Sequence, residues 1–412
     1  MKGNVIVGQS GGPTAAINSS LAGVYRTAKD RGAKKVYGML HGVQGLLQER
    51  YIDLSEHIKT ELDAELLKRT PAAFLGSCRY KLPEIHEDKA VYEKIFKILD
   101  KLDIEAFIYI GGNDSMDTIK KLSDYAIITG HPTRFVGCPK TIDNDLALTD
   151  HTPGYGSAAK YIGTSLKEII RDGFCLEYPK GLVTIVEIMG RNAGWLTGAA
   201  ALSQGEDCDG PDLIYLPEIT FDLHQFSDKV KQLLEKKPSV VVAVSEGIRT
   251  GDGNYVCELG SSVDFVDAFG HKQLSGTASY LASFIAGEIG CKTRAIELST
   301  LQRSASHAAS RVDILEAYQV GGAAVKAADE GDSGKMVVLQ RLSDDPYQCG
   351  TEVKDVHKIA NDEKLVPREW VNEEGTYVTD EFVAYVRPLI QGDVSPVMVD
   401  GIPRHLFRSY DM

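Results

Sequence analysis

The chain has 412 residues, 43% hydrophobic and 25% charged, which is ordinary globular composition with enough length for two to three domains. Its 45 Lys and Arg against 58 Asp and Glu give a formal net charge of −13, and no basic tract occurs, so nucleic acid is a poor partner. No apolar stretch reaches about 18 residues, so we expect no membrane contact. Seven scattered cysteines without a CxxC pair predict reduced thiols and a cytoplasmic protein.

Short apolar runs alternate with longer amphipathic segments along the chain. The predicted strands are 4–8, 36–40, 106–110, 135–138, 182–188, 213–216, 240–245, 295–298 and 336–339. The predicted helices include one after residue 14 and the segments 89–101, 115–125, 155–171, 222–236, 273–289 and 306–328. This alternation predicts an α/β fold of mainly parallel sheets covered by helices, arranged as two Rossmann-like lobes with the active site in the cleft between them.

The stretch from Pro139 to Asp145 follows an apolar strand and ends in Thr, Asp and Asn residues. The carboxyl ends of strands are where an open α/β sheet presents its chemistry. Asp143 could take a proton from a hydroxyl, Asp145 could hold a metal ion or orient the first carboxylate, and Lys140 could neutralise a developing negative charge. Together these roles predict phosphoryl transfer to an alcohol.

A glycine loop over residues 8–14 lies between the first strand and the helix that follows. Gly11 and Gly12 let the backbone approach a ligand, and the N-terminus of the next helix offers free N–H groups and a positive dipole end that suit phosphate. The loop is neither GxGxxG nor a Walker motif. A tight turn without a ligand and a phosphate loop are equally supported by this segment alone.

A second loop of this kind covers residues 110–115. Asp114 or Ser115 could simply cap the helix, which is the simpler interpretation of the segment in isolation. Because a second glycine pair, ending at Gly112, also lies at the end of a strand, the repetition favours phosphate binding.

Several charged residues outside these loops are also candidates. Arg191 follows the strand-ending Gly190 and could clamp an oxyanion bidentately, whereas an isolated surface ion pair is the simpler alternative. For the other candidates the alternative is an ordinary solvated charge. These are Arg79, Glu246, Arg294 and Arg303.

Taken in order, these segments resemble the phosphofructokinase family from residue 7 to about residue 303. The markers are Gly11-Gly12, Gly76-Ser77-Cys78-Arg79, residues 111–115, Thr141-Ile142-Asp143-Asn144-Asp145, Met189-Gly190-Arg191, Glu246 and the pair Arg294 and Arg303. T-I-D-N-D followed about 45 residues later by M-G-R is the most specific part of the match.

The resemblance implies an enzyme in which Asp143 removes the proton from the 1-hydroxyl of fructose 6-phosphate. It implies that Lys140, Asp114 and Arg191 also take part in the reaction. The residues implied for the sugar phosphate are Thr141, Ile142, Asp143, Met189, Gly190, Arg191, Glu246, Arg294, Thr300 and Arg303. The residues implied for the phosphoryl donor are Gly11, Gly12, Arg79, Gly112, Asp114, Ser115 and Lys140.

The resemblance also implies a metal ion and an oligomer. Mg²⁺ would be held by Asn113 and Asp145, although relatives usually carry Asp where this chain has Asn113. Arg294 would reach in from a neighbouring subunit, which requires a homodimer or homotetramer. Thr300 stands where relatives carry a histidine or tyrosine.

Two positions bear on the identity of the donor. Asp114 and Lys140 replace glycines of the ATP-using members, and both exchanges resemble the pyrophosphate-dependent branch. A carboxylate about 4 Å from the α-phosphate of ATP would repel it by roughly 4 kcal/mol at an effective dielectric near 20. We therefore expect a reversible transfer from pyrophosphate to fructose 6-phosphate, in glycolysis and gluconeogenesis.

Three alternatives are weighed against this interpretation. They are an ATP-dependent 6-phosphofructokinase, a non-catalytic subunit that binds sugar phosphate or nucleotide, and a Rossmann-type dehydrogenase. The first tolerates Asp114, the second is disfavoured because Asp143 and Asp145 are both present, and the third lacks GxGxxG.

The resemblance divides the chain into three parts. Residues 1–157 form the donor lobe, completed by about 304–335, and residues 158–303 form the fructose 6-phosphate lobe. Residues 336–412 form a C-terminal extension that packs on the lobes, with the apolar segment 385–390 beside the fructose 6-phosphate lobe.

Overall fold

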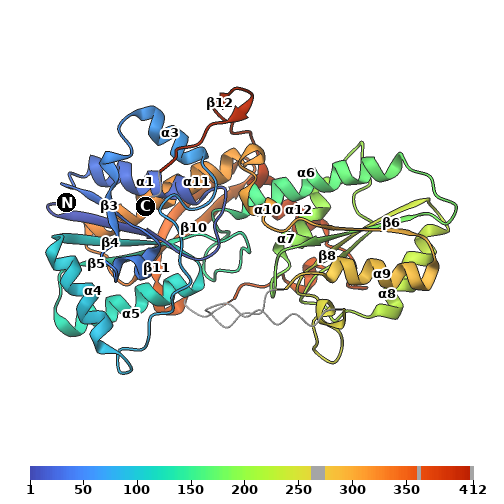
Figure 1. Cartoon of the computed structure of the whole chain (residues 1–412), viewed down its shortest axis with the longest axis horizontal. Coiled ribbons are helices and arrows are strands. Elements are labelled where there is room, and N and C mark those ends of the chain that lie inside the picture. Colours follow the sequence, from blue (N-terminus) through green and yellow to red (C-terminus); the bar gives the residue numbers. More distant parts are fainter. Residues whose placement is uncertain (261–273, 360–362, 409–412) are drawn as a thin grey trace.

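Two sheets, each flanked by helices, lie side by side in the computed structural model, which describes residues 1–260, 274–359 and 363–408 (Figure 1). The first sheet has seven strands in the order β11-β10-β5-β4-β1-β2-β3. Its strands are β1 (Asn4–Gln9), β2 (Val36–Met39), β3 (Tyr51–Asp53), β4 (Ile104–Gly111), β5 (Arg134–Pro139), β10 (Lys335–Asp344) and β11 (Tyr347–Asp355). All neighbours are parallel except β3 and β11, which pair antiparallel at the two edges.

Helices cover both faces of the first sheet because its central strands are apolar on both sides. Val5 and Val7 of β1 pack with α1 (Ile17–Asp30) and α11 (Arg311–Glu330). Ile6, between them, points to the other face and packs with α4 (Lys89–Lys101) and α5 (Asn113–Thr129). This alternation is the two-residue period of a strand buried on both faces.

The second sheet has four parallel strands in the order β7-β8-β6-β9. They are β6 (Leu182–Ile188), β7 (Leu213–Tyr215), β8 (Ser239–Ser245) and β9 (Lys292–Glu297). One face packs on α6 (Tyr155–Phe174) and the short α7 (Trp195–Gly198), and the other on α8 (Leu223–Leu234) and α9 (Thr277–Ile289). The predicted fold class, an α/β fold with two mainly parallel sheets covered by helices, is confirmed.

Every predicted strand is present, but the last two predicted helices begin later than expected. The segment 273–289 is helical from Thr277, and residue 273 lies outside the described residues. The segment 306–328 contains a separate short turn before α11, which begins at Arg311 because the Ser310 side chain caps it by accepting a hydrogen bond from the N–H of Asp313.

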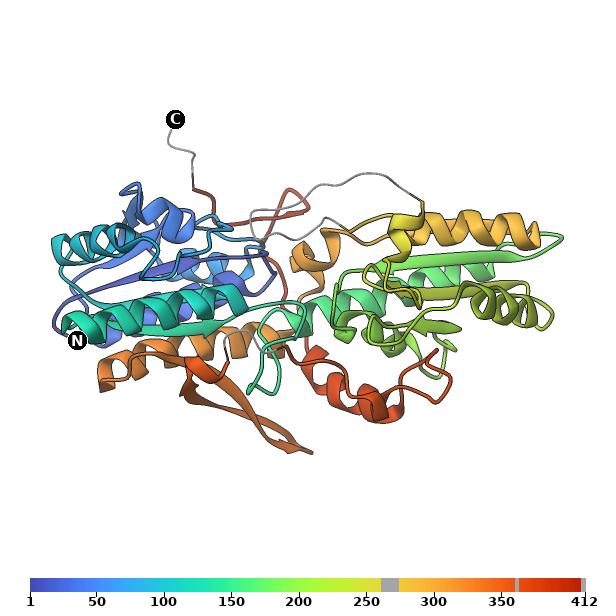
Figure 2. The same cartoon turned by 90° about the horizontal axis from the view of Figure 1, so that it is seen from below.

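The C-terminal part of the chain contributes to both lobes. β10 and β11 belong to the first sheet, and their hairpin extends away from that lobe (Figure 2). α12 (Asp380–Val386) and the turn Arg387–Ile390 pack on the second lobe, where Phe382 is 0% and Leu389 1% exposed beside Trp195. The expected packing of residues 385–390 is confirmed, and the lobe boundaries remain predictions.

The edge strands β3 and β11 were not predicted, nor was a helix after residue 60. β3 and β11 are edge strands whose residues are mostly half exposed, so they lack the apolar runs that identify the central strands. The helix α3 (Glu61–Arg69) starts at a capping box in which Thr60 and Asp63 satisfy each other's backbone N–H groups.

Across the described ranges, no helix is both long and apolar enough to cross a membrane.

Candidate active site

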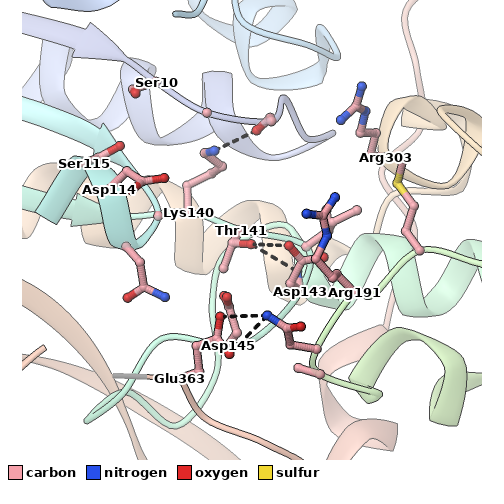
Figure 3. Close-up of a pocket in the computed structure, with 18 of the residues that line it drawn as sticks. Ser10, Asp114, Ser115, Lys140, Thr141, Asp143, Asp145, Arg191, Arg303 and Glu363 are labelled. Atoms are coloured by element: carbon pink, nitrogen blue, oxygen red, sulfur yellow. Dashed lines mark hydrogen bonds between the residues drawn. The ribbon is translucent and has the colours of Figure 1, made fainter. Parts of the chain in front are cut away.

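A cavity of about 610 Å³ lies between the two sheets, at the carboxyl ends of β1, β4 and β5 on one side and of β6 and β8 on the other (Figure 3). This is the edge at which parallel sheets present ligand-binding groups. The predicted residues that line it are Gly11, Gly12, Arg79, Gly112, Asn113, Asp114, Ser115, Lys140, Thr141, Ile142, Asp143, Asp145, Met189, Arg191, Glu246 and Arg303.

The Gly11-Gly12 loop is fixed by the segment that carries Arg79. The N–H of Gly11 donates to the carbonyl oxygen of Cys78 over 3.2 Å, and the hydroxyl of Ser77 donates to the carbonyl oxygen of Gly11 over 2.6 Å. Two segments that are distant in the sequence therefore form one wall of the cavity.

The helix after this loop does not present its N-terminus to the cavity as expected. α1 begins only at Ile17, and the Thr14 hydroxyl accepts hydrogen bonds from the N–H groups of Ala16 (3.1 Å) and Ile17 (2.9 Å). The cavity is instead lined by the loop itself up to Pro13. The prediction that the N-terminus of α1 faces a ligand is therefore wrong, because the described lining contains no residue of α1 and the N–H of Ile17 is bonded to Thr14.

The second glycine loop does place a helix N-terminus at the cavity. α5 begins at Asn113, and its N-cap residue, Gly112, has no side chain to satisfy the first N–H groups. Asp114 and Ser115 lie within the first turn rather than at the N-cap. The Oδ1 atom of Asn113 is buried, and no described residue donates a hydrogen bond to it. Free N–H groups and a free amide oxygen are therefore available at this end of the cavity.

Lys140 is a buried cation at the centre of the cavity wall. Its side chain is 2% exposed, and its Nζ donates to the carbonyl oxygen of Gly12 over 2.6 Å (Figure 3). Burial lowers the pKa of Lys140 to about 8, against an opposing effect of the nearby Asp143 carboxylate. A cation with little access to water interacts strongly with any anion that enters.

Asp143 lies half-buried beside this cation. Its backbone N–H donates to the Thr141 hydroxyl over 3.1 Å, and that hydroxyl lies 3.5 Å from the Asp143 Oδ2 atom. Burial raises the pKa of Asp143, while Lys140 and the Thr141 hydroxyl act to lower it. A carboxylate with a raised pKa is a better proton acceptor from an alcohol than an ordinary surface aspartate.

Asn144, between the two aspartates, explains the shape of this loop. Its φ of 56° is left-handed, a conformation that Asn adopts more readily than most residues. Its side chain is fully buried, donating to the Tyr385 hydroxyl over 3.0 Å and accepting from the Thr152 N–H over 3.0 Å. The asparagine therefore turns the backbone so that its two neighbours face the cavity while it faces the interior.

Asp145 lies next to two cavity residues that the sequence interpretation missed. Glu363, from the C-terminal extension, lies beside Asp145 (Figure 3), and Asn192 donates its Nδ2 hydrogens to Glu363 over 3.2 and 3.4 Å. Burial raises the pKa of Asp145 to about 7, with further contributions from Asp143 and Glu363. Asn192 directly follows M-G-R and could have been considered, whereas no sequence pattern identifies Glu363.

The opposite wall consists of the ends of β6 and β8. Gly190 has a φ of 133°, and a Cβ there would lie 2.6 Å from the Ala193 carbonyl oxygen, so only glycine fits. Its N–H donates to Glu246 over 3.3 Å, which places this carboxylate beside Arg191 at the cavity. Burial raises the pKa of Glu246 to about 7. Gly190 itself supports the wall and does not line it.

Arg303 supplies another cation. It lies beside the glycine loop, since a Cβ on Gly12 would be 3.3 Å from its Nη1 atom, and burial lowers its pKa. Figure 3 shows Arg303 and Arg191 on the side of the cavity opposite Asp114 and Lys140.

Arg294 and Thr300 lie outside the cavity. Arg294 is on the edge strand β9, where it forms an ion pair with Asp172 over 2.7 Å and lines a separate hollow of about 400 Å³. Thr300 precedes the short helix Leu301–Ser304. The chain by itself therefore does not bring these two predicted residues to the site.

The contents of the cavity define a class of protein. Buried and half-buried cations, a carboxylate with a raised pKa and two backbone loops at strand ends are the groups that phosphoryl transfer requires. The fold and the site are those of a two-lobed α/β phosphotransferase.

Comparisons with known proteins narrow this class to one family. The family model described as Phosphofructokinase matches residues 4–328, so the chain belongs to the phosphofructokinase family. It is 42% identical over 407 residues to the pyrophosphate–fructose 6-phosphate 1-phosphotransferase of Xanthomonas campestris pv. campestris, covering 98% of this chain and 96% of that protein. It is 40% identical over 403 residues to the enzyme of the same name from Halomonas elongata, covering 97% and 95%.

A solved structure supports the same family assignment. The pyrophosphate-dependent phosphofructokinase of Nitrosospira multiformis superposes with a TM-score of 0.88 at 35% identity, covering 98% of this chain and 95% of that one.

Proposed function

We propose that this protein transfers a phosphoryl group from pyrophosphate to the 1-hydroxyl of fructose 6-phosphate, giving fructose 1,6-bisphosphate and phosphate. The observation that carries the proposal is the juxtaposition, in one cavity, of the half-buried Asp143 and the 2%-exposed Lys140, with Asp114 at the first turn of α5. Both the Xanthomonas and the Halomonas relatives carry this activity in their names.

In the proposed reaction, Asp143 accepts the proton of the 1-hydroxyl as the hydroxyl oxygen forms a bond to the nearer phosphorus of pyrophosphate. The bond from that phosphorus to the bridging oxygen breaks, and the second phosphate leaves with the bridging oxygen and its electron pair. Lys140 and Arg191 stabilise the negative charge that spreads over the transferring group. One phosphoanhydride is exchanged for one phosphate ester, so the reaction runs readily in both directions.

Glu246, Met189 and Arg303 lie where they can hold the sugar phosphate, with Arg303 positioned for its 6-phosphate. Arg79 and the Gly11-Gly12 loop lie where they can hold the donor. These assignments follow the wall on which each residue lies and the resemblance to the family.

A divalent magnesium ion is part of the proposal. The buried Oδ1 of Asn113, which accepts no hydrogen bond from the described residues, and the carboxylate of Asp145 offer the hard oxygen ligands that Mg²⁺ prefers. Bound there with pyrophosphate, the ion would neutralise charge on the donor phosphates. Calorimetric titration of pyrophosphate should show tighter binding with Mg²⁺ than with EDTA, and Asp145→Asn should reduce that difference. Equal binding under both conditions would remove the metal from the proposal.

The donor assay is the decisive experiment. Formation of fructose 1,6-bisphosphate is measured with pyrophosphate and with ATP at equal concentrations, both with Mg²⁺. We expect pyrophosphate to be used far better than ATP. ATP activity equal to or above pyrophosphate activity would overturn the choice of donor, and no product with either donor would overturn the proposed reaction.

We further propose that the active enzyme is a homodimer or homotetramer in which Arg294 of one subunit reaches the sugar phosphate of another. Its position on an exposed edge strand, away from the cavity of its own chain, supports this arrangement. A cytoplasmic location is also proposed, supported by seven cysteines that are all free.

A further inference from the structure

Two residues of the C-terminal extension, Tyr385 and Lys364, contact the loop that carries the two aspartates. The Tyr385 hydroxyl accepts from Asn144 Nδ2 over 3.0 Å and donates to the carbonyl oxygen of Asp150 over 2.6 Å. One hydroxyl group therefore bridges both ends of this loop. Tyr385 lies beyond residue 328, where the match to the family model ends.

Lys364 contacts the same loop at neighbouring points. Its backbone N–H donates to the carbonyl oxygen of Asp145 over 2.7 Å, and its Nζ donates to the carbonyl oxygens of Asp150 (2.5 Å) and Thr149 (3.3 Å). Lys364 and Tyr385 therefore each form hydrogen bonds near both ends of the segment from Asn144 to Asp150.

The two residues are themselves anchored to the second lobe. The Trp195 indole N–H donates to the carbonyl oxygen of Lys364 over 2.7 Å, and the Trp195 and Tyr385 rings lie 5.3 Å apart. Trp195 is 2% exposed and begins α7, four residues after Arg191. The extension therefore connects the loop of the first lobe to the wall that carries Arg191.

We propose that Tyr385, together with Lys364, is a positioning residue that fixes Asn144 and so holds Asp143 and Asp145 in the geometry required for phosphoryl transfer. Neither residue lines the cavity, so each acts through the loop rather than on the substrate. Asn144 has a left-handed backbone and lies between the two carboxylates, so a change of its backbone angles after loss of its side-chain hydrogen bonds would redirect both. Displacement of a reacting group by about 1 Å can reduce the rate about 100-fold, which sets the size of the expected effect.

The proposal rests on the proposed function, and Tyr385→Phe in the full-length enzyme tests it. This variant keeps the ring and removes only the hydroxyl. We expect kcat with pyrophosphate to fall about 10- to 100-fold while the KM values for fructose 6-phosphate and pyrophosphate change less than about threefold. Tyr92→Phe is the matched control, because Tyr92 is 0% exposed and loses a similar hydrogen bond, to the Pro83 carbonyl oxygen, away from the loop. It should keep kcat within twofold.

Asn144→Gly provides the coupling test, because glycine keeps the left-handed backbone and loses the side chain. If Tyr385 acts through Asn144, the double variant should lose about as much kcat as the more impaired single variant, not the product of both losses. If Tyr385→Phe does not fold, Lys364→Met is measured in its place and should lower kcat in the same way.

The outcomes separate this inference from the proposed function. Activity of the parent enzyme with pyrophosphate tests the function, and if only ATP is used, the variants are compared with ATP. Tyr385→Phe with kcat within twofold of the parent, or with raised KM values alone, would overturn the positioning role. Fully multiplicative losses in the double variant would overturn it as well, as would a parent enzyme inactive with both donors.

Discussion

Replacing Lys140 with methionine should impair catalysis and stabilise the fold at the same time. The ammonium is 2% exposed and lies 2.6 Å from the Gly12 carbonyl oxygen on the cavity wall. A donor phosphate against this loop would lie about 4 Å from Nζ, where the attraction is roughly 4 kcal/mol at an effective dielectric of 20. Because Arg79 remains to compensate in part, we expect kcat/KM for pyrophosphate to fall about 100- to 1,000-fold.

The effect on stability has the opposite sign. Burial lowers the pKa of Lys140 from 10.5 to about 8, so below pH 8 the charged side chain costs folding free energy. That cost is about 3 kcal/mol at pH 7, and it disappears as the pH rises from 8 to 10.5. Lys140→Met should therefore unfold at higher guanidinium concentration than the parent at pH 7, and the difference should shrink above pH 8.

The same pKa predicts the pH dependence of activity. Since kcat/KM reports on the free enzyme, the parent value for pyrophosphate should decline as the pH rises through about 8 and Lys140 loses its proton. Lys140→Met should lack this decline.

Lys121→Met is the matched control. Lys121 is also a buried lysine of the first lobe, 6% exposed, and its Nζ also donates to a backbone carbonyl, that of Leu82, over 3.0 Å. Burial acts to lower the pKa of Lys121, but the hydrogen bonds that its ammonium donates to Asp117 and Glu84 outweigh this effect and raise the pKa. Its charge therefore stabilises the fold at neutral pH, and Lys121→Met should be less stable with kcat/KM within twofold.

The reasoning about Lys140 would be refuted by either of two results. One is a loss of less than about tenfold in kcat/KM for pyrophosphate, which would mean that the ammonium does not face the donor. The other is a Lys140→Met enzyme less stable than the parent at pH 7, which would mean that the buried charge is compensated in the fold.

Three further predictions concern the base, the donor and a buried histidine. Asp143→Ser should lower kcat by about 100-fold or more while the KM for fructose 6-phosphate changes far less in steady-state kinetics, and a change in KM alone would make Asp143 a binding residue. Asp114→Gly combined with Lys140→Gly should raise kcat/KM for ATP relative to pyrophosphate, and an unchanged ratio would place donor choice elsewhere. Burial acts to lower the pKa of His151, but the hydrogen bonds from its ring nitrogens to the carboxylates of Asp150 and Glu316 outweigh this effect and raise the pKa. The stability this adds is complete below pH 6.5 and is lost as the pH rises through the raised pKa, so His151→Gln should cost more in urea unfolding at pH 6 than at pH 9.

The central strands and the stretch that lines the cavity after β5 could be predicted because their signals are local. Strands buried on both faces, such as β8, are continuous apolar runs, and Lys140 to Asp145 follow directly where one of them ends. The family model covers residues 4–328, the same region in which these signals occur.

The parts that could not be predicted depend on contacts between distant segments. Glu363 lies beside Asp145 only because the extension crosses from the first lobe to the second, and nothing near residue 363 in the sequence marks that path. The hydrogen bonds that the Thr14 hydroxyl accepts from Ala16 and Ile17 were missed for a different reason: the sequence does not show that α1 begins only at Ile17. Tyr385 looks in the sequence like an apolar packing residue, and only the structure shows where its hydroxyl lies.

The charges in the cavity explain why a metal ion belongs in the proposed reaction. Four of the described lining residues are cations and five are carboxylates, so the lining carries a formal charge of 4 − 5, or −1. The cations are Arg79, Lys140, Arg191 and Arg303, and the carboxylates are Asp114, Asp143, Asp145, Glu246 and Glu363. Two substrates that both carry phosphate would be repelled by this balance, since like charges about 4 Å apart repel by roughly 4 kcal/mol in such a site. A divalent cation beside Asn113 and Asp145 changes the balance to +1, on the side where the donor binds. In the proposed reaction, the carboxylates assigned to the base and to discrimination against ATP would therefore leave the site in need of a cation that the protein itself does not provide.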